Sequence, residues 1–72
     1  DPKHVAAPMP GTIPTIAVAT GDSVAAGDVL LTIEAMKMET AVRAERATRI
    51  VEVVARQNES VEAKDLLLIL ES

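Results

Sequence analysis

The chain of 72 residues contains no cysteine and no phenylalanine, tryptophan or tyrosine. Without cysteine it has neither a disulfide framework nor a thiolate metal site, which fits a reducing compartment. Without aromatic rings it lacks the stacking surfaces on which many proteins hold single-stranded nucleic acid, and its net charge of −4 opposes binding to phosphate backbones. We therefore expect no nucleic-acid partner.

The sequence also lacks long hydrophobic runs. No apolar segment approaches the roughly 20 residues that a membrane-spanning helix needs, and no signal-peptide pattern opens the chain. We therefore expect no membrane partner and a cytoplasmic location, or the mitochondrial matrix if the parent protein is eukaryotic.

The features of an enzyme are missing as well. A single domain of this size buries only about 60% of its unfolded surface. Its core must consist of Val, Ile, Leu, Ala and Met, because 49% of the residues are hydrophobic and none is aromatic. A ligand cleft of the usual volume, on the order of 300 Å³ or more, is hard to fit inside such a body. No phosphate-binding glycine loop or nucleophile motif is present, so we expect no catalysis by the chain alone.

What the sequence does contain is two copies of one motif, offset by 37 positions. Residues 21–34 and 58–71 share seven identical pairs out of 14. The identical pairs are Ser23/Ser60, Val24/Val61, Ala26/Ala63, Asp28/Asp65, Leu30/Leu67, Leu31/Leu68 and Glu34/Glu71, and the same offset pairs Val5 with Val42, Ala7 with Ala44 and Ile13 with Ile50. Two copies are too few for a solenoid. We therefore expect half-repeats 5–34 and 42–71 to form one closed body with an approximate two-fold axis.

Within each half the residues favour β-strands. Residues 13–18 and 50–55 are rich in β-branched side chains, and residues 29–33 and 66–70 are short apolar runs bounded by turn residues and charges. Gly21-Asp22 and Asn58-Glu59 fall at matching turns, as do Gly27-Asp28 and Lys64-Asp65. The three prolines Pro8, Pro10 and Pro14 confine the first strand region to an edge or a bulge. We predict an all-β domain of about eight short strands, arranged as a flattened barrel or sandwich.

A helix over residues 34–56 is the alternative, because Glu, Ala, Met, Lys and Arg are good helix formers. The repeat opposes this helix. Residues 49–56 correspond to residues 12–19, where Pro14, Thr15 and Ile16 do not favour a helix.

The connecting segment 35–41 has no counterpart elsewhere in the chain and must turn from one half into the other. A tight hairpin there places Met36 and Lys37 at its tip, in solvent. Most lysines are exposed and have no specific role. Here, however, the lysine is flanked by two of only three methionines in the chain, and exposed thioethers suit contact with a partner protein.

Residues 34–40, Glu-Ala-Met-Lys-Met-Glu-Thr, resemble the biotinylation motif of biotin carboxyl carrier domains, in which Ala-Met-Lys-Met surrounds the modified lysine. The segments Ala-Pro-Met-Pro-Gly at residues 7–11 and Gly-Asp-Ser-Val at residues 21–24 also stand where that family has matching segments. The resemblance covers residues 5–70 and is greatest to the carrier domains of pyruvate carboxylases. It implies the flattened biotinyl or lipoyl fold.

The resemblance also implies what the domain does. We expect biotin to be attached covalently to Lys37 by a biotin protein ligase, which would recognise the turn together with Ala35, Met36, Met38 and Glu34 or Glu39. The loaded group would then be carboxylated at a biotin carboxylase site and would deliver the carboxyl group at a carboxyltransferase site. The resemblance thus implies a carrier domain that has these two sites as its partners.

The chain departs from the family at two places in its second half. The family usually has Gly where this chain has Thr48, and Gly-Asp where it has Asn58-Glu59. Asn tolerates a positive φ, but a β-branched residue is strained there. We therefore expect an altered turn near Ala47-Thr48.

Two other interpretations are open to test, and a third, a small enzyme, would need a catalytic constellation that the sequence does not contain. A lipoyl carrier resembles this chain in fold and repeat, but its lysine typically follows Asp and precedes Ala, where Met36 and Met38 stand here. An unmodified interaction module does not need a Met-Lys-Met tip. A metal site is not expected, because His4 is the one histidine and has no cysteine to join it.

Overall fold

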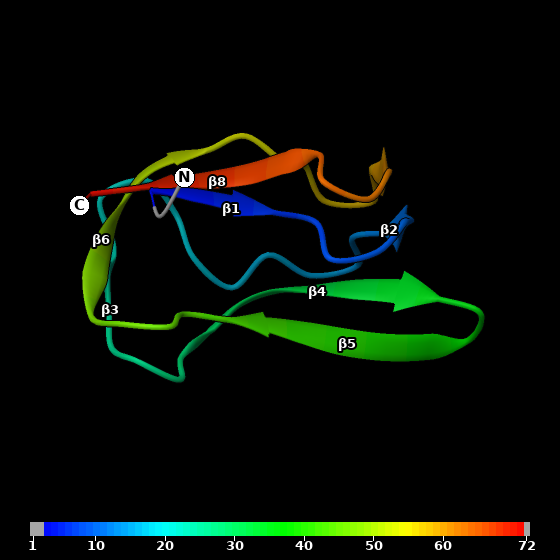
Figure 1. The fold of residues 1–72 in the computed structure, drawn as a ribbon, viewed down its shortest axis with the longest axis horizontal. Coiled ribbons are helices and arrows are strands. Elements are labelled where there is room, and N and C mark those ends of the chain that lie inside the picture. The colour runs from blue at the N-terminus through cyan, green and yellow to red at the C-terminus, as the bar shows by residue number, and fades with distance from the viewer. Residues whose placement is uncertain (1–2, 72) are drawn as a thin grey trace.

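Residues 3–71, the part of the chain that the computed structural model describes, form eight β-strands and no helix (Figure 1). The strands are β1 (His4–Ala6), β2 (Gly11–Thr12), β3 (Ser23–Val24), β4 (Val29–Ala35), β5 (Met38–Arg43), β6 (Thr48–Val53), β7 (Ser60–Val61) and β8 (Leu66–Leu70). Strands β4, β6 and β8 are rich in Val, Ile and Leu, which pack well on a half-buried pleated surface. The all-β prediction is confirmed, and residues 34–56 form strands in place of the alternative helix.

The strands form two antiparallel sheets, in the orders β1-β8-β6-β3 and β5-β4-β2-β7. Adding the repeat offset of 37 to the residue numbers converts β1, β2, β3 and β4 into positions in β5, β6, β7 and β8. The same operation therefore converts the strand order of one sheet into that of the other. The predicted quasi-two-fold repeat is confirmed. The two sheets make a sandwich, and they do not close into a barrel because each keeps two edge strands.

The core between the sheets follows the same symmetry. The buried apolar side chains are Ala7, Ile13, Val24, Leu30, Leu31, Ile33, Ala44, Ile50, Ala55, Val61, Leu67, Leu68 and Leu70. Each of them except Ala55 has a buried partner 37 positions away, and the counterpart of Ala55, Val18, is half-buried against the same core. Among the described residues no polar or charged side chain is buried. The repeat in the sequence is therefore mainly a repeat of core positions.

The turns repeat in the same way. Gly21 and Asn58 have φ values of 94° and 67°, and Gly27 and Lys64 have φ values of 90° and 73°. The Gly21 and Asn58 amides donate to the carbonyls of Ile50 and Ile13, themselves a repeat pair, at 2.8 and 2.6 Å. Asn58 therefore takes the left-handed conformation expected of it, and Lys64 takes it without being a residue type that favours it.

The strand predicted over residues 13–18 was wrong. Regular pairing in that region stops at β2, and only an isolated bridge joins Ile16 to Leu31. Pro14 has no amide hydrogen to donate to a ladder, which explains the interruption. The segment still lies along β4, because the Ala17 amide donates to the Leu30 carbonyl at 2.9 Å and the Thr32 amide to the Thr15 carbonyl at 3.0 Å.

The altered turn expected near Ala47-Thr48 was also wrong. Residues 45–47 are bends, as are residues 8–10 in the first half, and Thr48 is the first residue of β6 with no positive φ. Its backbone pairs with Val24, and its hydroxyl donates to the Glu71 carbonyl. Thr48 therefore fits without the strain that a left-handed conformation would impose on a β-branched side chain.

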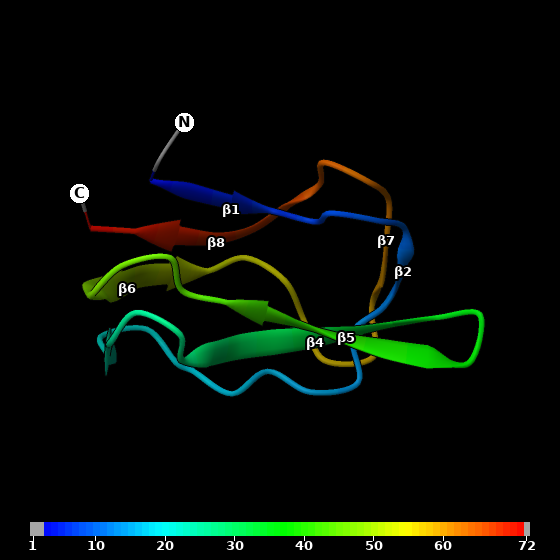
Figure 2. The same cartoon turned by 60° about the horizontal axis from the view of Figure 1, so that its bottom comes forward.

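The molecule is elongated, with Cα extents of 32 × 18 × 17 Å. The hairpin that joins β4 to β5 projects at one end of the long axis, and the start of β1 and the end of β8 lie at the other (Figure 1, Figure 2). None of residues 3–71 belongs to a helix capable of crossing a membrane.

Candidate functional site: the tip of the β4–β5 hairpin

The β4–β5 hairpin is the most extensively paired element of the fold. Its register runs from Val29 opposite Arg43 to Ala35 opposite Met38, with a bulge between Val29 and Leu31. Only Met36 and Lys37 remain between the last paired residues, so the turn has two residues. The long ladder holds this turn at a defined place at the end of the molecule.

Both turn residues have a left-handed backbone, with φ of 52° at Met36 and 68° at Lys37. Two positive φ values are the pattern of a type I′ turn, whose twist matches that of the strands it joins. Such turns favour Asn-Gly, because a left-handed conformation costs other residues about 1–2 kcal/mol each. Met36-Lys37 is therefore a locally unfavourable pair, and the strand pairing behind it compensates for the strain.

The side chains at the tip are open to solvent. Met36 is 94% exposed and Met38 is 72% exposed, while Lys37 between them is also exposed. An apolar side chain with that much exposed surface contributes little to folding stability. The two methionines thus flank Lys37 in the sequence with apolar, flexible groups that are available to another molecule.

The two faces of the hairpin differ near the tip. Glu34 and Glu39 are directly opposite each other, and Ala35 and Met38 form the next pair. Because neighbouring residues of a strand point to opposite faces, the two carboxylates lie on one face and Ala35 and Met38 on the other. Glu34 is also paired with Thr12 of β2, so its backbone is held from both sides. The predicted residues Glu34, Ala35, Met36, Lys37 and Met38 are therefore brought together in one projecting element.

The other predicted features lie elsewhere. Lys64 is exposed in the turn before β8, in the left-handed conformation described above, and His4 is exposed in β1. Arg43 donates to the Gly27 carbonyl at 2.9 Å and so ties the end of β5 to the preceding turn. Among the described residues, no three His, Asp or Glu side chains gather closely enough to hold a metal ion.

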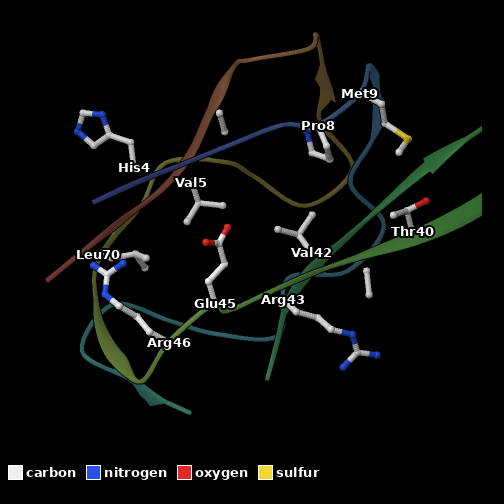
Figure 3. Close-up of a pocket in the computed structure, with 12 residues that line it drawn as sticks. His4, Val5, Pro8, Met9, Thr40, Val42, Arg43, Glu45, Arg46 and Leu70 are labelled. Atoms are coloured by element: carbon white, nitrogen blue, oxygen red, sulfur yellow. The ribbon is translucent and has the colours of Figure 1, made fainter. Parts of the chain in front are cut away.

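Sequence reasoning missed a groove of about 530 Å³ between β1 and β5, the edge strands of the two sheets (Figure 3). Its walls include Val5, Val42, Met9 and Leu70, with the charged side chain of Glu45 between them. The expectation concerned a cleft inside the body, whereas this groove lies on the open side of the sandwich. The repeat pair Val5/Val42 was the available signal, since it places two equivalent strands beside the two-fold axis.

The tip fits a prosthetic group held through an amide bond. Such a group needs a primary amine that a second enzyme can reach and a backbone that holds the amine away from the body of the carrier. Exposed Lys37 on a two-residue turn meets both requirements, and the exposure of its neighbours leaves the approach open.

Comparison with known proteins assigns the family. Residues 3–70 match the family model of the biotin and lipoyl attachment domain, described as biotin-requiring enzyme. The chain is 42% identical over 71 residues to the pyruvate carboxylase of Bacillus subtilis, covering 99% of this chain and 6% of that protein. It spans about 6% of the length of the first curated relatives it matches.

Solved structures also resemble this fold, among them a pyruvate carboxylase and a lipoyl domain. A pyruvate carboxylase from Rhizobium etli superimposes with a TM-score of 0.78 and 45% identity, covering 93% of this chain and 6% of that one. The lipoyl domain of the 2-oxoglutarate dehydrogenase complex from Azotobacter vinelandii superimposes with a TM-score of 0.84 and 27% identity, covering 96% and 95%. The chain therefore belongs to the family of biotin-requiring enzymes, as a carrier domain whose cofactor is biotin.

Proposed function

We propose that this chain carries biotin in amide linkage on Lys37 and moves a carboxyl group between the biotin carboxylase and carboxyltransferase sites of an enzyme like pyruvate carboxylase. The observation that carries the proposal is the position of Lys37, exposed on a two-residue turn at the far end of the longest hairpin. When attached, biotin supplies a ring nitrogen that can hold and release a carboxyl group.

Lysine is the residue that this attachment requires. Its amine is a nucleophile when it is deprotonated and can form a stable amide, whereas the guanidinium of arginine stays protonated and cannot. The type I′ turn holds the Lys37 backbone while the four-carbon side chain stays flexible. The same residue therefore provides a fixed starting point and a mobile arm.

A biotin protein ligase must distinguish Lys37 from Lys3 and Lys64. Ala35, Met36, Met38 and Glu34 are the residues we propose it recognises. Lys64 also lies on an exposed turn, but its neighbours are Glu62, Ala63 and Asp65, none of which is a large apolar side chain. The two exposed thioethers are thus the feature that separates the lysine at the hairpin tip from the lysine at the other turn.

We propose that the chain does not catalyse the carboxylation itself. Catalytic sites stabilise developing charge with preorganised polar groups in a water-excluded setting. Among residues 3–71 no polar or charged side chain is buried, so the described part of the domain offers no such setting. Its contribution is instead effective concentration, because a tethered carrier meets two sites at a far higher local concentration than free biotin.

The chain matches about 6% of the length of these relatives. This share fits a carrier that is joined to both partner sites within a larger enzyme. The compartment stays a prediction: the cytoplasm, or the mitochondrial matrix for a eukaryotic parent. The curated relatives include bacterial proteins and a mitochondrial pyruvate carboxylase of Mus musculus.

The test is the intact mass of the chain after incubation with a biotin protein ligase, biotin and ATP. We expect one biotinyl group on the wild type, mapped to Lys37 by peptide analysis. Lys37→Arg should gain none, and the matched variant Lys64→Arg should gain one. Because a lipoyl domain has nearly the same length and fold, the incubation is repeated with lipoate and a lipoate ligase. A lipoyl group in place of biotin would overturn the proposal, and no modification by either enzyme would indicate an unmodified interaction module.

A further inference from the structure

The three methionines of the chain lie in two different environments. Met36 and Met38 at the hairpin tip are 94% and 72% exposed, and they are the two most exposed large apolar side chains among the described residues. Met9 is half-buried, packs against the core and lines the groove between β1 and β5. The chain thus contains two accessible thioethers and one sheltered thioether for comparison.

An accessible thioether reacts with peroxides. The sulfur lone pair attacks one oxygen of hydrogen peroxide, an S–O bond forms as the O–O bond breaks, and the departing hydroxide takes the remaining proton to give water. The sulfur is oxidised by two electrons to a sulfoxide, and the peroxide is reduced. Methionine sulfoxide reductases reverse this step, so the modification can be regulatory.

Both accessible thioethers lie next to Lys37. Met36 precedes it in the turn, and Met38 follows it as the first residue of β5, paired with Ala35. Oxidation turns a flexible apolar group into a polar, chiral one with a strong hydrogen-bond acceptor. Any enzyme that binds apolar thioethers while it reaches the Lys37 amine loses that contact when they are oxidised.

We propose that Met36 and Met38 form a reversible oxidation site, and that its sulfoxide state slows the attachment of biotin to Lys37. This inference rests on the proposed function. The site is separate from the core, because neither methionine belongs to the buried cluster or to the half-buried residues packed against it. Oxidation at the tip therefore leaves the sandwich folded, and that is the condition for a modification that a reductase can reverse.

The first part of the experiment measures selectivity. The chain is treated with hydrogen peroxide over a time course, the oxidant is removed with catalase and desalting, and peptide mapping quantifies the sulfoxide at each methionine. We expect Met36 and Met38 to be oxidised before Met9, with an unchanged far-ultraviolet circular dichroism spectrum. Oxidation of Met9 at the same rate would contradict the shelter of Met9 in the groove between β1 and β5 and would overturn the proposed selectivity.

The second part measures the initial rate of biotin attachment by purified ligase before and after peroxide. We expect a fall of about tenfold, which corresponds to about 1.4 kcal/mol in transition-state binding. Methionine sulfoxide reductases A and B with dithiothreitol should restore the rate. Met9→Leu should respond to peroxide as the wild type does, whereas the double variant Met36→Leu/Met38→Leu should show the same rate before and after treatment, whatever that rate is.

The outcomes separate this inference from the proposed function. Equal rates before and after peroxide in a wild type that is oxidised at the tip would overturn the inference alone. An equal fall in the double variant would assign the effect to another residue and would overturn it too. No biotin attachment to the untreated wild type would instead overturn the proposed function, and the inference with it.

Discussion

Gly27 and Lys64 are equivalent residues with the same left-handed backbone conformation, which suits glycine and does not suit lysine. Their φ values are 90° and 73°, and each amide donates at 2.8 Å to the carbonyl of an alanine of the other half, Ala44 or Ala7. Glycine adopts a positive φ freely, whereas a side chain there costs about 1–2 kcal/mol. The second half therefore carries strain that the first half avoids.

Lys64→Gly should remove this strain. Glycine also raises the entropy of the unfolded chain, so we expect a net gain of about 0.5–1 kcal/mol in the free energy of unfolding. Urea denaturation followed by circular dichroism measures it. The matched change Gly27→Lys should lower stability, and a Lys64→Gly variant less stable than the wild type would show that the lysine side chain makes a stabilising contact.

Gly11 has a different reason to be glycine. A Cβ atom there would lie 2.5 Å from the backbone oxygen of Glu34 and 2.8 Å from Cγ2 of Ile33. We expect Gly11→Ala to destabilise the domain by about 1–3 kcal/mol, the usual effect of overpacking. The control is Thr48→Ala at the equivalent position, which already accommodates a Cβ and should lose about 1 kcal/mol at most with its hydrogen bond to Glu71. Equal losses in the two variants would contradict this account.

The residue scale also shows what the sequence could not reveal. The candidate motif around Lys37 was visible because the proposed attachment of biotin requires a lysine side chain. The close approach of Gly11 to β4 depends on how two strands that are distant in sequence pack, which no local pattern reports. Thr48 is a second example. The family usually has glycine at this position, which suggested a strained turn, but the Thr48 backbone is extended in β6.

At the scale of the element, the β4–β5 hairpin combines a long ladder with an unfavourable turn. Met36→Asn places at the first turn position a residue that tolerates positive φ. We expect this variant to be more stable by about 0.5–1 kcal/mol and at the same time to be loaded more slowly with biotin, because one exposed thioether is lost. Thermal denaturation and the ligase assay measure the two quantities. A variant that loses stability would show that the turn is not under strain.

The elements that were predicted well are those in which every residue favours the same structure. Residues 66–70 form β8 as predicted, because five consecutive apolar residues lie between turn and charge signals. Residues 13–18 were predicted as a strand from their β-branched content, and Pro14 prevented it. The sequence showed that the prolines confine this region to an edge or a bulge. Which hydrogen bond is missing depends on the position of Pro14 in the ladder, and only the register of β2 with β4 shows this position.

At the scale of the whole molecule, each sheet takes two strands from each half of the chain. A separate peptide of residues 1–37 would contain β1 and β3 without β8 and β6, the strands with which they pair. Only β2 and β4 would still have each other as partners. We expect peptides 1–37 and 38–72 to be unfolded separately, since an isolated pair of strands is marginal at best. An equimolar mixture should regain the strand signal in circular dichroism as concentration rises. A strand spectrum in either peptide alone at high dilution would contradict the interleaving of the halves.

The two-fold architecture was predictable because core positions repeat in the sequence. The groove between β1 and β5 was not predictable, because the volume of the groove depends on the distance between the two sheets. Chain length alone gives the volume of a filled sphere and contains no information about open edges. The sandwich leaves one side open along its edge strands, and a small domain can therefore present a surface hollow that its core volume alone does not suggest.

The repeat also relates the two ends of the long axis. Adding 37 to the β4–β5 connection leads to the place where β8 ends and β1 begins, and β8 pairs antiparallel with β1 as β4 pairs with β5. A peptide linker with the sequence of residues 35–40, inserted between β8 and β1, should thus close a second hairpin, and the chain could be opened at a different loop. Such a circular permutant would be a double-headed carrier with one lysine at each pole. In the natural arrangement the geometry is nearly symmetric, and the two poles differ because one joins β4 to β5 through Met36-Lys37, whereas β8 ends and β1 begins at the other.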